Sequence, residues 1–338
     1  MTIFLNSPLF FSGFYMIRYW QQNGRQLVKV KKDEIDSSKR LWVDARNVTQ
    51  EEIQFLQGEY ALDGELLADV MDQDELSRIE DWDDYVLTIM RLPVFTPGAD
   101  PAYTTAPMGA VIFPDKIITI CWTDCEVLRD ICANRIKGLT LTDFPAFIIR
   151  ILARSDMMFL RYLKEINRRT NSIQNELHEQ IENSELIQLL GIEKSLTFFT
   201  TSLKANQLFL EKIRRTRILK LDEDDKDWLD DVEIDNKQAM QMADTYSRIV
   251  GGIMEAFASV ISNNMNVIMK KLTVISLVLM VVSFITSFWG MNIRLPFSTS
   301  SSWHGFFFIT GLCVVSAATA YLIMNFNPVR KIRNRRKK

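Results

Sequence analysis

Two long stretches without charged side chains lie near the C-terminal end of the chain. The first covers residues 272–291 and the second residues 306–324. An α-helix rises about 1.5 Å per residue, so roughly 20 apolar residues cross the hydrocarbon core of a bilayer. The pattern predicts two transmembrane helices, at 270–292 and 304–326, joined by an extracytoplasmic loop at 293–303.

Upstream of these spans, the chain favours very long helices. Between Pro145 and Pro296 it contains no proline and only four glycines, a composition that permits uninterrupted helices. Apolar residues recur there at helical spacing, for example over 203–213. We expect a helical stalk over 141–269 that continues into the first span.

The N-terminal part has the pattern of a mixed domain. Three segments rich in β-branched apolar residues are separated by turn residues: 85–92, 109–113 and 117–121. Such segments are typical of strands. Thr49, followed three residues later by Glu52, predicts the capped start of a helix. We therefore expect an α/β domain over residues 1–140.

The formal net charge of −2 averages two unlike parts. Residues 270–338 carry ten basic side chains and no acidic one, which leaves 30 basic and 42 acidic side chains in residues 1–269. Basic residues concentrate on the cytoplasmic side of membrane spans, and here they precede the first span and fill the tail at 327–338. We predict a multi-pass protein of the cell membrane, in contact with lipid, with both termini cytoplasmic. The acidic body argues against a nucleic-acid partner.

Motifs of the common enzyme classes are missing from the sequence. His178 and His304 are its only histidines, too few for a His-rich zinc or iron site. The sequence has no Walker A loop, GxSxG elbow, GxGxxG turn or HExxH helix. It therefore predicts a protein that is not an enzyme.

Small and polar side chains follow one line along the first span. They recur at intervals of three and four residues: Thr273, Ser276, Met280, Ser283, Ser287 and Gly290. This spacing places them on one helix face. Two interpretations stay open, because small residues let membrane helices pack closely and hydroxyls also suit a water-filled conduit. Two spans cannot enclose a pore, so a conduit requires a homo-oligomer.

The end of the first span carries a short signature. Trp289-Gly290-Met291-Asn292, followed by a short loop, a second span and a basic tail, resembles the Gly-Met-Asn signature of the CorA family of divalent-cation (Mg²⁺) transporters and channels. Further segments resemble that family too: Trp42-Val-Asp44, Thr49-Gln-Glu-Glu52, Leu229-Asp-Asp231 and the approach to the membrane at 266–273. The resemblance covers nearly the whole chain.

The resemblance implies a funnel-shaped homopentamer whose first spans line the pore. It implies a selectivity filter at Gly290, Met291 and Asn292. It also implies a set of pore-lining residues: Asn266, Leu272, Ser276, Met280, Ser283 and Ser287. Leu272 and Met280 would form hydrophobic gates, and Mg²⁺ would be both the transported and the regulatory ion.

The stalk contains a strongly acidic stretch. Nine acidic residues and one basic residue lie between Asp222 and Asp235, and most such runs are solvated surface. Five copies around one axis would repel one another, and divalent cations bound between subunits would relieve this repulsion. The resemblance implies one such ion between Asp231 and the neighbouring subunit's equivalent of Asp69. Ala68 stands where the family has a further acid.

These features predict a passive Mg²⁺ uptake channel, with cobalt and nickel as further ions, that cytoplasmic Mg²⁺ closes. It needs no ATP motif, because the membrane potential supplies about 4.6 kcal/mol per 100 mV for a divalent cation. The loop at 293–302 has no acid, where the family commonly has Met-Pro-Glu. Two alternatives therefore stay open: a zinc-transporting relative, and a membrane-anchored sensor of divalent cations that does not conduct.

Overall fold

The computed structural model of the chain describes residues 17–179, 183–216, 218–291 and 303–325. The chain divides into two compact units, residues 1–254 and 255–338. The strands are β1 (Ile17–Asn23), β2 (Gln26–Val30), β3 (Leu41–Arg46), β4 (Arg78–Asp81), β5 (Val86–Phe95), β6 (Tyr103–Ile112) and β7 (Lys116–Cys121). The helices are η1 (Lys32–Glu34), α1 (Gln50–Tyr60), α2 (Gly64–Met71), α3 (Glu126–Cys132), α4 (Phe144–Glu179), α5 (Asn183–Arg215), α6 (Glu223–Trp289) and α7 (Trp303–Asn325).

The seven strands form one mixed sheet in the order β2-β1-β3-β7-β6-β5-β4. Among the described strands, β3 and β7 are the one parallel pair, and the other pairs are antiparallel. Residues 87–94 of β5 are buried without interruption. A strand that is buried on both faces has to be covered on both faces, so the sheet requires helices on each side.

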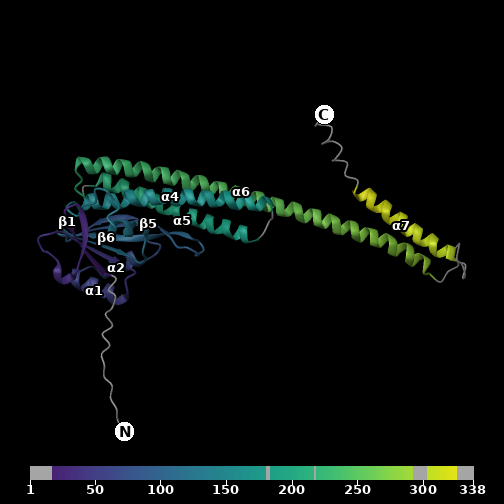
Figure 1. Cartoon of the computed structure of the whole chain (residues 1–338), viewed down its shortest axis with the longest axis horizontal. Helices are drawn as coiled ribbons and strands as arrows, with labels where there is room; N and C mark the ends of the chain where they lie inside the picture. Colours follow the sequence, from purple (N-terminus) through teal and green to yellow (C-terminus); the bar gives the residue numbers. More distant parts are fainter. Residues whose placement is uncertain (1–16, 180–182, 217, 292–302, 326–338) are drawn as a thin grey trace, which may run out of the picture. The chain divides into compact units, whose positions relative to one another are not determined.

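Helices cover the two faces of the sheet in separate layers (Figure 1). On one face, Leu56 of α1 and Val70 of α2 join the apolar core with strand residues such as Ile89. The approach of α2 is close, because a Cβ at Gly109 of β6 would lie 2.4 Å from a methyl carbon of Val70. On the other face the long helices pack, and the ring of Phe147 in α4 lies 5.5 Å from that of Trp42.

Several expected elements are present, with extensions. The three predicted strands are β5, β6 and β7, but β6 begins at Tyr103 and runs through Pro107. Pro107 cannot donate a ladder hydrogen bond, and its carbonyl accepts one from the Cys121 thiol. The capping box of Thr49 and Glu52 is confirmed at the start of α1. The N-terminal strands β1 to β3 were not predicted as strands, because polar residues interrupt their apolar positions.

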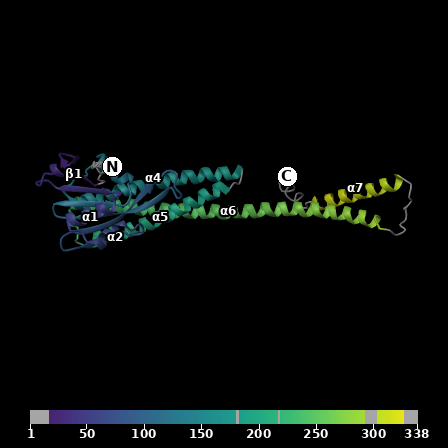
Figure 2. The ribbon, with the colours of Figure 1, turned by 90° about the horizontal axis from the view of Figure 1, so that it is seen from below.

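The long helices that the proline-free stretch predicts are α4, α5 and α6, of 36, 33 and 67 residues. The first two run in opposite directions side by side (Figure 2). The rings of Phe159 and Phe199 meet between them at 5.0 Å. Val232, Ala239 and Val250 of α6 are buried. The N-terminal part of α6 is therefore packed within the first unit.

A buried carboxyl group joins α4 to α6. Asp156 is fully buried, and its Oδ1 accepts a hydrogen bond of 3.2 Å from Nδ2 of Asn236. Asp156 Oδ2 and Asn236 Oδ1 find no donor among the described residues. Burial raises the pKa of Asp156 well above its ordinary value, and the nearby charge of Asp235 adds to this despite the bond from Asn236. A neutral acid is therefore the form that suits this position.

Replacing Asp156 by asparagine should stabilise the protein at alkaline pH. A carboxyl whose pKa is raised on folding costs stability as pH rises from its unfolded pKa to its folded pKa, by about 1.4 kcal/mol per pH unit. An amide does not titrate, so Asp156→Asn should gain stability over the native chain at about pH 8 relative to about pH 5. Thermal unfolding at both pH values measures this, with the exposed Asp227→Asn as control. Parallel pH profiles for Asp156→Asn and the native chain would contradict it.

Candidate functional site

The C-terminal part of α6 presents apolar side chains outward. Of the described residues, α6 is the one helix long and apolar enough to cross a membrane, and a shorter apolar helical stretch covers Phe306–Leu322. None of the apolar window of α6 is buried within the chain. Met280 is 64% exposed and Phe284 71% exposed. Apolar surface of this extent calls for lipid or further protein around it.

Two faces of this part of α6 differ in their exposure. One face is half-buried, through Val274, Val278, Val281, Val282, Ile285 and Trp289. The ring of Trp289 lies 6.4 Å from that of Phe308 in α7, which runs back in the opposite direction (Figure 1). The stripe of small and polar residues is exposed along its whole length: Thr273, Ser276, Met280, Ser283, Ser287 and Gly290. The stripe is therefore not the face that packs against α7 of the same chain.

The remaining predicted pore residues lie on or just beyond α6. Asn266 and Leu272 are both exposed on the helix. The helix ends at Trp289, and the backbone N–H of Gly290 donates to the carbonyls of Thr286 and Ser287 at 3.0 and 3.2 Å. Met291 follows, 51% exposed, and Asn292 lies outside the described residues. The start of the predicted filter thus sits at a helix C-terminus.

The two predicted regulatory acids lie on different elements of the first unit. Asp231 is exposed on α6, and Asp69 is partly exposed on α2. Asp69 is already paired, because its Oδ2 accepts a hydrogen bond of 2.6 Å from Nη2 of Arg78. The charge of Asp231 also affects Asp235, which lies one turn further along α6. Burial raises the pKa of Asp235, and the negative charge of Asp231 raises that pKa further.

The acidic stretch at the start of α6 is more compensated than its sequence predicts. Arg214 of α5 forms ion pairs with Asp230 and Glu233, the latter at 2.7 Å. Glu233 also pairs with Lys237, one turn along the helix, at 2.5 Å. The count of nine acids against one base covered residues 222–235 alone. The basic partners of Asp230 and Glu233 lie outside that stretch, on α5 and on the next turn of α6.

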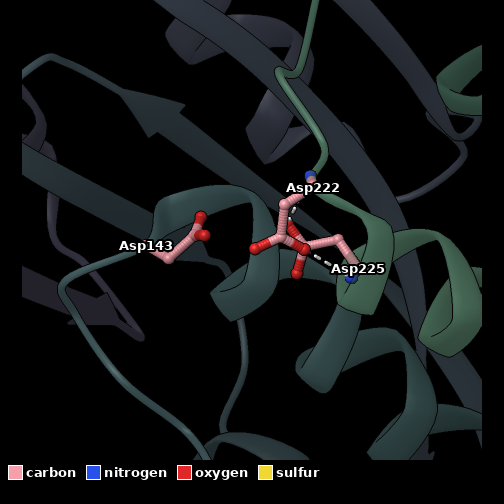
Figure 3. A group of neighbouring side chains, drawn as sticks. All are labelled: Asp143, Asp222 and Asp225. Atoms are coloured by element: carbon pink, nitrogen blue, oxygen red, sulfur yellow. Dashed lines mark hydrogen bonds between the residues drawn. The ribbon is translucent and has the colours of Figure 1, made fainter.

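A group of three carboxylates lies where this acidic stretch begins, beside the start of α4 (Figure 3). Asp143, Asp222 and Asp225 have oxygens within 4.8 Å of one another. Each belongs to a helix start: Asp143 accepts from the backbone of Ala146 at the start of α4, and Asp222 accepts from the backbone of Asp225 at the start of α6. Backbone N–H groups and helix dipoles stabilise negative charge there. Burial and the charge of Asp143 raise the pKa of Asp225. The cluster is thus explained by helix capping.

Comparisons with known proteins decide the family. A family model described as CorA-like Mg²⁺ transporter protein matches residues 37–331. The chain belongs to the CorA family. The match confirms the resemblance to this family, whose model describes a Mg²⁺ transporter.

Relatives of this CorA-family chain match it over most of its length. The cobalt/magnesium transport protein CorA of Methanocaldococcus jannaschii is 27% identical over 305 residues, covering 86% of this chain and 92% of the relative. The complete structure of the CorA magnesium transporter from that organism matches with a TM-score of 0.73 and 22% identity, over 91% of this chain and 96% of that one. The cytoplasmic domain of ZntB from Vibrio parahaemolyticus matches with a TM-score of 0.56 and 13% identity, over 75% and 98%. The solved structures confirm the CorA-like fold, with its N-terminal α/β domain and long helix.

Two residues with contacts among the acids of this CorA-family chain were not predicted: Arg78, which pairs with Asp69, and Asp143, which lies beside Asp222 and Asp225. The role of Arg78 was not predicted, because a single arginine in a strand forms no sequence motif. Asp143 carries a signal that was available, since an aspartate before a helix with proline in its first turn is a common N-cap. Pairing across elements was not predictable for either residue.

Proposed function

We propose that the chain is the subunit of a homopentameric Mg²⁺ uptake channel of the cell membrane, with Co²⁺ and Ni²⁺ as further ions. The observation that carries this proposal is the exposed polar stripe of α6, which leads to the Gly-Met-Asn signature at the helix end. Within the described part of one chain, no helix covers this stripe. Five copies around an axis would turn it toward a shared conduit, with both termini on the basic, cytoplasmic side.

The side chains suit passage of a hydrated cation. Mg²⁺ gives up its water shell reluctantly, so an amide oxygen at Asn292 would receive the hydrated ion by hydrogen bonds to its water, with Gly290 and Met291 forming the turn. Hydroxyls of Ser276, Ser283 and Ser287 would do the same along the conduit. Asn266 would line its inner end.

Closure of the conduit would come from apolar rings. Leu272 and Met280 offer no oxygen ligand, and a narrow apolar constriction can stop ions by losing its water. When the rings separate, the membrane potential drives the cation inward without a nucleotide.

Uptake of Mg²⁺ is tested by growth rescue of a strain that lacks its own Mg²⁺ uptake. The native chain should restore growth, and Asn292→Ala at equal expression should not, because the amide that receives the hydrated ion is gone. Radiotracer or dye-based flux in liposomes, with Mg²⁺, Co²⁺, Ni²⁺ and Zn²⁺ in turn, measures the ion preference. No flux of any of these ions would favour a non-conducting sensor, and flux of Zn²⁺ alone a zinc transporter.

Regulation would use the acids of the stalk. A divalent cation held between Asp231 of one subunit and Asp69 of the next would relieve repulsion between subunits and hold the closed state. Asp231→Ala should therefore weaken the protection from proteolysis that added Mg²⁺ provides. The exposed Asp227→Ala is the matched control. Unchanged protection in Asp231→Ala would remove this role.

A further inference from the structure

Arg78 holds three carboxylates from three different elements. Its Nη2 donates to Asp69 of α2 at 2.6 Å, its Nε donates to Glu80 of β4 at 2.6 Å, and its Nη1 donates to Glu75 in the loop between them. Glu80 is held from a second side, because its other oxygen accepts from the ring N–H of Trp82 at 3.1 Å. Each of the three guanidinium nitrogens, Nε, Nη1 and Nη2, thus donates to one of the three carboxylates.

The cluster keeps an excess of negative charge. One guanidinium faces three carboxylates, whose side chains are between 21% and 38% exposed. Partial burial acts to raise the pKa of Glu80, but the hydrogen bonds from Arg78 and Trp82, together with the positive charges of Arg78 and Lys212, outweigh it and lower that pKa. Because the three side chains are partly exposed, cations from solvent can reach this cluster.

The loop that carries Glu75 is anchored by side chains of β5 and α5. The buried Arg91 donates to the backbone carbonyls of Gln73 and Glu75 at 3.1 and 2.6 Å, and to the hydroxyl of Ser202 in α5 at 2.9 Å. Asn206 of α5 accepts from Ser77 at 2.6 Å. The loop with Glu75 is therefore anchored by Arg91 of β5 and by α5, independently of the bond between Arg78 and Asp69.

We propose that Arg78 is a built-in competitor of the regulatory divalent cation at Asp69. This inference rests on the regulatory role proposed for Asp69. A cation that binds Oδ2 of Asp69 competes with Nη2 of Arg78 for that oxygen, while Glu75 and Glu80 retain the guanidinium. The exchange raises the Mg²⁺ concentration at which the site fills, so Arg78 sets the threshold at which cytoplasmic Mg²⁺ closes the channel.

The test measures the Mg²⁺ concentration that half-protects the purified full chain from proteolysis. Removing a positive charge that contacts the ligand oxygen should lower this concentration in Arg78→Gln by roughly tenfold. Asp69→Asn should raise it, and Arg78→Gln with Asp69→Asn should match Asp69→Asn alone. Arg161→Gln is the control, because Arg161 binds both oxygens of Glu126 on the exposed surface, and its midpoint should equal that of the native chain.

The outcomes separate this inference from the proposed regulation. A raised midpoint in Asp69→Asn with an unchanged one in Arg78→Gln overturns the competition and leaves the regulation standing. An unchanged midpoint in Asp69→Asn overturns both. A lowered midpoint that persists in the double variant places the cation on Glu75 and Glu80, which also overturns the competition at Asp69. Should Arg78→Gln unfold, Arg78→Lys decides, since a single ammonium group cannot bind three carboxylates and should lower the midpoint by a smaller factor.

Discussion

Ser283→Val should reduce Mg²⁺ flux by roughly tenfold or more, because it extends an apolar constriction that a hydrated ion cannot wet. Ser283 is exposed on α6, one turn from Met280 on the same face. In the proposed pentamer the change would replace a ring of five hydroxyls by a ring of five isopropyl groups directly beside the methionine ring. Flux into liposomes loaded with a Mg²⁺-sensitive dye measures the effect.

Thr286→Val is the matched control for Ser283→Val. Thr286 is also exposed on α6 but lies off the stripe, and its hydroxyl donates to the carbonyls of Val282 and Ser283 at 3.1 and 3.0 Å. Its polar group is satisfied within the helix, so its loss should leave flux unchanged. Equal flux from both variants and the native chain, at equal oligomer mass by size exclusion, would show that the stripe packs helices and does not line a conduit.

Arg46→Met should destabilise the α/β unit by about 3–5 kcal/mol, because it leaves a buried carboxylate unpaired. Asp44 is fully buried, and its Oδ1 accepts from Nε of Arg46 at 2.9 Å. Nη1 of Arg46 also forms an ion pair of 2.6 Å with Oδ1 of Asp124. Loss of Arg46 therefore also removes the ion pair that joins β3 to the loop before α3. The midpoint of thermal unfolding should fall by roughly 10 °C for a unit of this size.

Two further variants separate charge from packing in the Arg46 experiment. Asp44→Leu with Arg46→Met replaces the pair by apolar side chains and should recover much of the lost stability, since no buried charge remains. Arg161→Met breaks the partly exposed pair with Glu126 and should cost less than about 1 kcal/mol. A double variant as unstable as Arg46→Met alone would contradict the electrostatic explanation.

Much of the fold follows from local pattern. The proline-free stretch predicts the long helices, and Thr49 with Glu52 predicts the start of α1, because helix propagation and capping depend on neighbouring residues. The strands β1 to β3 were missed, since burial there comes from the pairing of β3 with β7, whose residues lie about 75 positions away in the chain. The expected strand at 109–113 is only the C-terminal part of β6, which begins at Tyr103 and includes Pro107.

The sequence alone determined the charge division of the chain, the two apolar stretches, the stripe of small and polar residues along one face of the first of them, and the signature that marks the CorA family. Each depends on composition and spacing, which act locally along a helix. The tertiary structure decided which charges meet. It brought Arg78 to Asp69 and Arg214 to the stalk acids, and it buried Asp156 against Asn236. Such pairings depend on how distant elements pack, and electrostatic energies change steeply with distance and burial.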